Sequence, residues 1–239
     1  NPEIASFSGR YADLEPAFSP DGKQLFFASN RPLDDTGDAK DYDIWVVART
    51  TASGWSEPKN IGPMVNTSAD EFYPSVTKSG TIYFTATYER GIGKEDIWQC
   101  HFVNGQYTKA EVLGEGVNSK GYEFNAFVAP DESYILFTGY GRKDDLGGGD
   151  LYISLRNADG TWAAARHLEG GINSSKIDYC PYVTPDGYYF FFTSERPQAK
   201  PYADKPLKYN DFLKTLQMPG NGNGDIYWVE MKAVTEKLK

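Results

Sequence analysis

Four acidic residues occupy equivalent positions in this chain, each nine residues before a tight turn: Asp13, Glu71, Glu123 and Asp178, which precede turns at Gly22, Gly80, Glu132 and Gly187. If the fold gathers these carboxylates into a ring at the mouth of a channel, their repulsion requires a cation or hydrogen-bond donors among them. Because carboxylate oxygens suit Ca²⁺, the first hypothesis is a ligand or Ca²⁺ site. The alternative, which we favour, is that each carboxylate pairs with an arginine of its own repeat or caps a turn.

Tyrosines accompany all four carboxylates, at Tyr11, Tyr73, Tyr122 and Tyr179. Their rings could stack on sugar rings, or they could pack between structural repeats, and we favour packing. Two of the carboxylates could in principle serve as the acid and base of a glycosidase. An acidic residue in every repeat fits symmetry better than such a division of labour, so we expect binding rather than catalysis.

Other reactive side chains are few and poorly placed for chemistry. The two histidines, His101 and His167, fall toward the expected sheet edges, which argues against a histidine base or a zinc triad. The two cysteines, Cys100 and Cys180, lie at non-equivalent repeat positions, so we expect two free, buried thiols. The sequence has no nucleophile elbow, P-loop or dinucleotide-binding glycine motif.

The elements that must position these residues form a fourfold repeat. The turn centres at 22, 80, 132 and 187 are 58, 52 and 55 residues apart, a period typical of propeller blades. After each turn comes a short apolar run (LFF, IYF, ILF and FFF), which indicates a strand buried on both faces. An arginine, then an aspartate that opens a third strand, follow in each copy. Three copies end in a fourth strand.

The first copy, LEPAFSPDGKQLFFASNR followed by DIW, resembles the WD40-like propeller repeat of the TolB type. The fourth copy matches well, whereas copy two has Lys78-Ser79 in place of Pro-Asp and copy three has Glu132 in place of Gly. The resemblance implies a β-propeller and is specific for fold, because propellers host enzymes, adaptors and lectins alike. It also favours a periplasmic interaction module of the bacterial cell envelope.

We therefore predict an all-β, single-domain propeller of four blades with four antiparallel strands each, over approximately residues 11–61, 67–113, 119–168 and 174–232. The last blade lacks a fourth strand of its own, and residues 3–8 read as an orphan strand. We expect this N-terminal strand to complete the last blade, which would tie the termini together and cover a sheet edge. The rival interpretation is a larger ring built from two chains.

Three further sets of repeated residues are predicted to be structural. The arginines (Arg31, Arg90, Arg142, Arg196) and the third-strand aspartates (Asp43, Asp96, Asp150, Asp225) should lie at one end of their blades. Arg31 with Asp43 and Arg196 with Asp225 are the expected ion pairs. The repeated asparagines (Asn66, Asn118, Asn173) should organise the turn before the next blade.

The net charge and the loops indicate which classes of partner to expect. The net charge of −9 and the lack of a basic stripe argue against nucleic acid, and no apolar run is long enough to span a membrane. We expect a monomer, periplasmic or secreted after removal of a leader. The loop at 32–42 is acidic, and an insertion at 197–224 contains a short helix at Tyr209–Met218. We expect a protein or envelope polysaccharide to bind where these loops meet the acidic ring.

Overall fold

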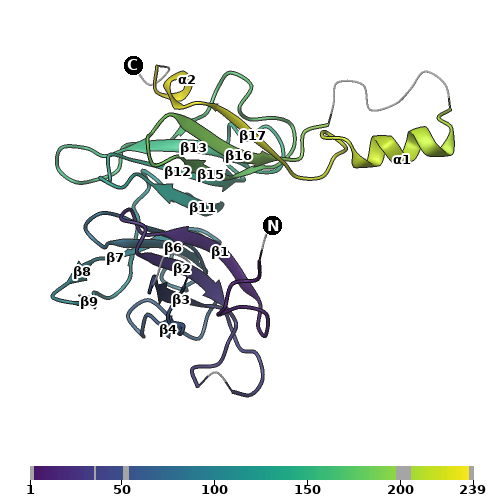
Figure 1. Cartoon of the computed structure of the whole chain (residues 1–239). Helices are drawn as coiled ribbons and strands as arrows, with labels where there is room; N and C mark the ends of the chain where they lie inside the picture. Colours follow the sequence, from purple (N-terminus) through teal and green to yellow (C-terminus); the bar gives the residue numbers. More distant parts are fainter. Residues whose placement is uncertain (1–2, 35, 51–53, 198–205, 237–239) are drawn as a thin grey trace.

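The computed structural model describes residues 3–34, 36–50, 54–197 and 206–236. The chain folds into four antiparallel sheets, the blades of a β-propeller, and each blade is built from consecutive strands. Figure 1 shows blades 1 and 2 in the lower part of the molecule and blades 3 and 4 in the upper part. The predicted fold class of four antiparallel blades is thereby confirmed.

The strands are as follows. Blade 1 contains β1 (Asp13–Phe18), β2 (Gln24–Ser29), β3 (Asp43–Ala48) and β4 (Lys59–Asn60). Blade 2 contains β5 (Glu71–Val76), β6 (Ile82–Ala86), β7 (Asp96–Cys100) and β10 (Glu111–Val112), with β8 (Phe102–Val103) and β9 (Gln106–Tyr107) as a separate hairpin. Blade 3 contains β11 (Tyr122–Val128), β12 (Tyr134–Tyr140), β13 (Asp150–Leu155) and β14 (Arg166–His167), and blade 4 contains β15 (Asp178–Val183), β16 (Tyr189–Ser194) and β17 (Asp225–Glu230).

Blades 2 and 3 bury both faces against their neighbours, as the unbroken apolar runs predict, whereas blades 1 and 4 each pack one face on a neighbouring blade. We call the face that packs on the next blade in sequence the forward face, and the opposite one the rear face. The forward face of blade 1, with Phe26 and Ile44, packs on the rear face of blade 2, with Phe84 and Trp98. Equivalent clusters join blade 2 to blade 3 and blade 3 to blade 4. The core is therefore three repeats of one sheet-on-sheet interface.

The N-terminal segment does not complete the last blade, and this prediction is corrected. Residues 3–8 form no strand, and the β15–β16–β17 sheet has three strands among the described residues. Phe7 instead packs on the rear face of blade 1, where its ring stacks on Phe27 with centroids 5.0 Å apart and meets Trp55 edge-on. Burial of this ring against an aromatic face outweighs strand pairing at a distant edge.

Two helices complete the described chain. Helix α1 (Tyr209–Gln217) confirms the short helix predicted in the insertion, and it has no buried residue. Figure 1 shows it projecting away from blade 4. Residues 198–205 of the insertion lie outside the described part. Helix α2 (Met231–Thr235) follows β17 and buries Met231 and Val234 at the junction of blades 3 and 4. No described helix is long and apolar enough to cross a membrane.

Candidate functional site

The four repeated carboxylates are buried side chains with partners of their own. Three pair with the arginine of the same blade: Asp13 with Arg31 at 2.8 Å, Glu123 with Arg142 at 3.0 Å and Asp178 with Arg196 at 2.8 Å. The fourth, Glu71, makes no ion pair with an arginine in the part of the chain that the structure describes. It accepts hydrogen bonds from the Thr67 hydroxyl at 2.7 Å and the Tyr88 hydroxyl at 2.6 Å.

These contacts agree with the structural interpretation of the four carboxylates. No group of three or more His, Cys, Asp or Glu side chains is placed to hold a metal ion within the described ranges. Glu71 shows the consequence of lacking an arginine, because burial raises its pKa to about 7 despite three hydrogen-bond donors.

The predicted arginine–aspartate pairs are wrong, because the arginines are committed to the preceding carboxylates. Asp43 pairs with Lys40 at 2.9 Å and accepts a bond from Asn60. Asp225 accepts from the backbone N–H of Gly220, and Asp96 accepts from two backbone N–H groups of its loop. The third-strand aspartates therefore close loops, and Asp150 does so together with His167 at 2.8 Å.

The repeated asparagines are structural, as predicted. The side-chain amide of Asn66 accepts from the Ile44 N–H and donates to the Ile44 carbonyl, both at 2.9 Å. Asn118 and Asn173 make the same two bonds to Ile97 and Leu151. Each asparagine thus ties the connection between blades to a third strand, in the way a further strand would.

A different ring of four residues lines the centre of the molecule. Each lies seven residues before its turn centre, at a β-bulge of the innermost strand, and each has left-handed backbone with φ between 52° and 57°. The members of this bulge ring are Glu15, Tyr73, Asn125 and Cys180. Left-handed backbone is costly for such residues and gathers at functional sites. A bulge also re-aims a side chain, so the strain marks this ring as the site candidate.

The bulge ring opens into a central pocket of about 800 Å³. All four innermost strands contribute, and the pocket continues to the turns after them, with Arg49 and Lys78 at that end. The walls are apolar and carry the rings of Phe18, Phe127, Tyr134 and Tyr182. This volume and mixture of apolar walls with a few polar groups are typical of ligand sites.

Burial tunes the polar groups of the ring. Desolvation raises the pKa of Glu15 to about 7, although its carboxylate accepts a 2.6 Å hydrogen bond from the Tyr73 N–H. Desolvation by the surrounding pocket walls and the neighbouring Glu15 charge raise the pKa of the Tyr73 phenol, and they bring that of the Cys180 thiol, which is exposed to the pocket, to about 11. The Asn125 side chain is buried, and neither its nitrogen nor its oxygen has a hydrogen bond of ordinary geometry. This amide lies beside the Tyr73 phenol, whose pKa it lowers, and is an incompletely satisfied polar group at the pocket.

The polar groups of the bulge ring can recognise a polar ligand. Cys180 is a weak nucleophile near neutral pH, because only the thiolate attacks and its pKa is raised. Glu15 is the one carboxyl group of the bulge ring, and a second carboxyl, Glu95, lies close enough for its charge to raise the pKa of Glu15. A half-ionised carboxyl, a phenol and an incompletely satisfied amide can bind a polar group at the end of an apolar body.

The sequence identified one member of this ring, Tyr73. The other tyrosines lie elsewhere: Tyr11 donates to the Gly37 carbonyl, Tyr122 packs on Tyr140, and the Gly224 backbone approaches the Tyr179 hydroxyl. Both cysteines are free as predicted, but Cys180 is exposed rather than buried. The four residues of the ring have equivalent spacing in the sequence, seven residues before each turn centre. Because their types differ, this spacing shows no motif until the structure reveals a bulge at each position.

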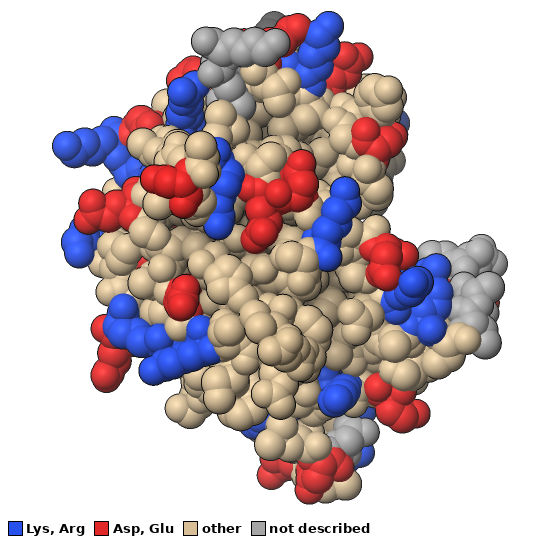
Figure 2. Space-filling model, turned by 90° about the vertical axis from the view of Figure 1, so that its left-hand side faces the viewer, with Lys and Arg blue, Asp and Glu red and all other residues tan. Residues whose placement is uncertain are grey.

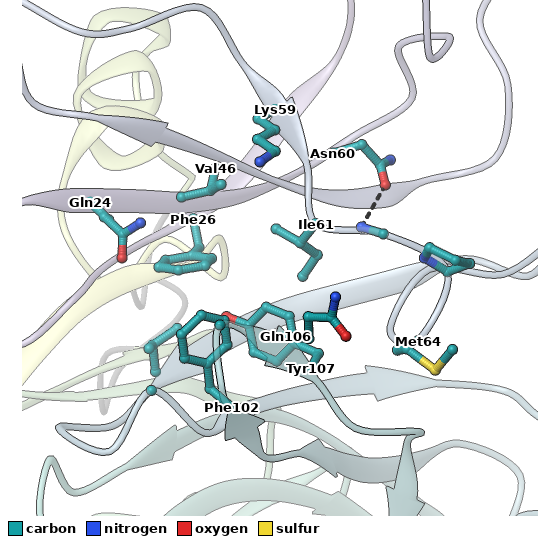
Figure 3. A pocket seen from close by; sticks show the side chains of 15 residues that line it. Gln24, Phe26, Val46, Lys59, Asn60, Ile61, Met64, Phe102, Gln106 and Tyr107 are labelled. Atoms are coloured by element: carbon teal, nitrogen blue, oxygen red, sulfur yellow. Dashed lines mark hydrogen bonds between the residues drawn. The ribbon is translucent and has the colours of Figure 1, made fainter.

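A second cavity of about 570 Å³ lies between blades 1 and 2 and is a weaker candidate. Figure 3 shows Phe26, Ile61 and Tyr107 on its walls, with Lys59 above them. Its Asn60 is already engaged, since the side-chain oxygen accepts from the Gly62 N–H at 2.9 Å. On the face in Figure 2, charges of both signs are interspersed around a broad uncharged area, without a continuous basic surface.

Comparison with known proteins finds propellers among solved structures, whereas no family model and no curated protein matches. TolB from Acinetobacter baumannii is 16% identical over 75% of this chain and 39% of its own, with a TM-score of 0.44. A putative TolB from Agrobacterium tumefaciens is 14% identical over 93% and 83%, also at 0.44. A periplasmic gluconolactonase from Pseudomonas aeruginosa is 15% identical over 75% and 50%, at 0.42. The prediction of a four-bladed β-propeller is confirmed by the four consecutive antiparallel sheets of this chain.

Proposed function

We propose that this propeller is a non-enzymatic binding module that takes a projecting side chain of a partner protein into its central pocket. Glu15, Tyr73 and Asn125 bind the polar end of that side chain, and the aromatic walls surround its apolar body. The TolB-type resemblance of the repeats supports a place in the bacterial cell envelope. The carrying observation is that one strained position, occupied in all four blades, holds four different polar residues facing one pocket.

The comparison between repeat positions supports this proposal. Where the fold needs a residue, the blades repeat it, as with the three asparagines and the four third-strand aspartates. At the bulge the backbone conformation repeats, whereas the side chain changes from carboxyl to phenol, amide and thiol. The four side chains at the bulges share no structural role, although their backbone is strained in the same way. We expect this combination at a site that binds an asymmetric ligand.

The preferred side chain is apolar with a neutral hydrogen-bonding tip, such as tyrosine or glutamine. Arg49 and Lys78 stand at the turn end of the pocket and disfavour a basic side chain, and Glu15 disfavours an acidic one. A ligand that covers Glu15 removes more water from it and favours its protonated form. Binding should therefore take up a proton and weaken as the pH rises through about 7.

The test uses a blocked heptapeptide with one central tyrosine, and calorimetric titration at about pH 6 and about pH 8. We expect the wild type to bind more tightly at pH 6. Glu15→Gln, which mimics the neutral acid, should bind alike at both pH values, and Glu15→Ala should lose about tenfold or more in affinity. The matched control peptide carries a central aspartate. No binding of tyrosine or glutamine peptides at millimolar concentration would contradict the proposal.

A second candidate is carbohydrate binding in the same pocket. It is favoured by the rings of Tyr134 and Tyr182 beside a carboxyl and an incompletely satisfied amide, since stacking and such polar groups together recognise sugars. Neutral oligosaccharides in the same titration separate the two: a Glu15-dependent signal from glycans alone would replace the peptide proposal with this one.

A further inference from the structure

The forward face of blade 4 is one half of an interface that occurs three times within the chain. Ile226 on this face is 77% exposed, whereas the residues at the equivalent position in blades 1 to 3, Ile44, Ile97 and Leu151, are 0% exposed. Trp228 beside it is 57% exposed. Its ring meets that of Tyr189 edge-on with centroids 5.3 Å apart, so the patch is already ordered.

The rear face of blade 1 is the complementary half. Phe18 on this face is 55% exposed, whereas its equivalents Val76, Val128 and Val183 are 8%, 2% and 3% exposed, because a preceding blade covers each of them. Phe7 covers part of the face, and its carbonyl accepts a hydrogen bond from Arg31. No preceding blade packs there within the described chain.

Phe7 also sits where a connection from a preceding blade would sit. Arg142 and Arg196 donate in the same way to the carbonyls of Val117 and Ile172, which lead from one blade into the next. The outer edge of blade 4, at β17, is also unpaired in the described part of the chain. Within the described ranges no fourth strand pairs with β17, although the equivalent residues of β3, β7 and β13 pair with β4, β10 and β14.

We propose that a second copy of this chain fills both halves, with the forward face of blade 4 in one copy packed on the rear face of blade 1 in the other. The contact is head-to-tail, and repeating it about a twofold axis closes a ring of eight blades from two chains. The occupant is a second copy because its blade 1 offers the same kind of surface that blades 2, 3 and 4 already offer. One chain leaves its own two halves exposed at the same time, so they do not satisfy each other.

Closure makes two such contacts together, which raises the stability of the pair well above that of a single contact. The proposal replaces the expected monomer with the two-chain ring, and it does not depend on the ligand of the central pocket. It predicts that the apolar area left on blade 4 is an interface rather than a free surface.

The test is the mass in solution, by light scattering on a sizing column at about 10 to 100 µM protein. We expect twice the 26.7 kDa of one chain for the wild type. Ile226→Glu and Phe18→Glu, which each spoil one half, should give single chains with unchanged circular dichroism. Leu146→Glu, at an exposed residue of a blade 3 loop, is the matched control and should stay at twice the mass.

Mixing the two disrupted variants distinguishes head-to-tail contact from a symmetric patch. One variant keeps an intact forward face and the other an intact rear face, so the mixture regains one sound contact and a pair of chains. A wild type that stays a single chain, disrupted variants that still pair, or a mixture that stays single would each overturn the proposal. A ladder of masses above two chains would overturn the closed ring.

Discussion

Arg31→Ala is expected to lower the free energy of unfolding by about 3–5 kcal/mol, the usual cost of removing one partner of a buried ion pair. Both side chains of the pair are almost wholly buried, so Asp13 would be left as an unpaired charge. The same guanidinium donates to the Phe7 carbonyl and lies over the rings of Phe27 and Trp45. Urea unfolding followed by tryptophan fluorescence measures the change.

The chain supplies two matched controls for Arg31. Arg90 occupies the equivalent position in blade 2 but donates to the Ala110 carbonyl and lies over Trp98, with no carboxylate partner recorded among the described residues. Arg90→Ala should cost only about 1–2 kcal/mol, a hydrogen bond and a cation–π contact. Lys23→Ala removes an exposed pair with Asp21 and should cost under about 1 kcal/mol. Equal losses at positions 31 and 90 would contradict the assigned role of the buried carboxylates.

Stability is expected to fall as the pH rises from about 5 to about 8, by up to about 3 kcal/mol for each of Glu15 and Glu71. Both carboxyls have a pKa near 7 in the folded chain against an ordinary 4.5. Folding therefore binds protons that the unfolded chain releases between these values. The stabilisation is complete below pH 4.5 and is lost as the pH passes through 7.

Glutamine substitutions test whether Glu15 and Glu71 cause this fall in stability with pH. Glu71→Gln keeps an oxygen acceptor for Thr67 and Tyr88 and should reduce the pH dependence. The double variant Glu15→Gln with Glu71→Gln should reduce it further, to the slope that other buried carboxyls with a raised pKa, such as Glu95 and Glu123, contribute. Asp186→Asn is the control, because the pKa of Asp186 is lowered and it titrates below the range. Wild-type stability that rises steadily from pH 5 to pH 8 would contradict these assignments.

Fold and repeat were predictable because they depend on residues that recur. The turn, the apolar strand and the aspartate recur at nearly constant spacing, and such a repeat predicts the blades of a propeller. For each carboxylate the sequence favoured an arginine of the same repeat or a turn cap over a metal as the partner. Spacing alone does not say that Arg31 turns back to Asp13 rather than forward to Asp43.

The site and the N-terminus were not predictable on the same grounds. The bulge ring depends on one extra residue in each innermost strand, and a bulge shifts register without a motif of its own. Its members differ, so a search for repetition passes over Asn125 and Cys180. The place of Phe7 depends on three-dimensional competition between two distant sheets, which local pattern does not encode.

The central claim is that ligand binds in the pocket of the bulge ring, and protection of Cys180 from iodoacetamide tests it most directly. Cys180 is exposed in the pocket, and buried Cys100 is an internal control that reacts only when the chain unfolds. With a thiol pKa of about 11, alkylation at about pH 8 is slow enough to follow by mass spectrometry.

A saturating tyrosine-centred heptapeptide should slow alkylation of Cys180 about tenfold or more, and Asn125→Ala should remove most of that protection at the same peptide concentration. The aspartate-centred peptide should leave the rate unchanged. A peptide that raises the unfolding temperature while Cys180 reacts at its free rate would show that the ligand binds outside the pocket, and would contradict the account.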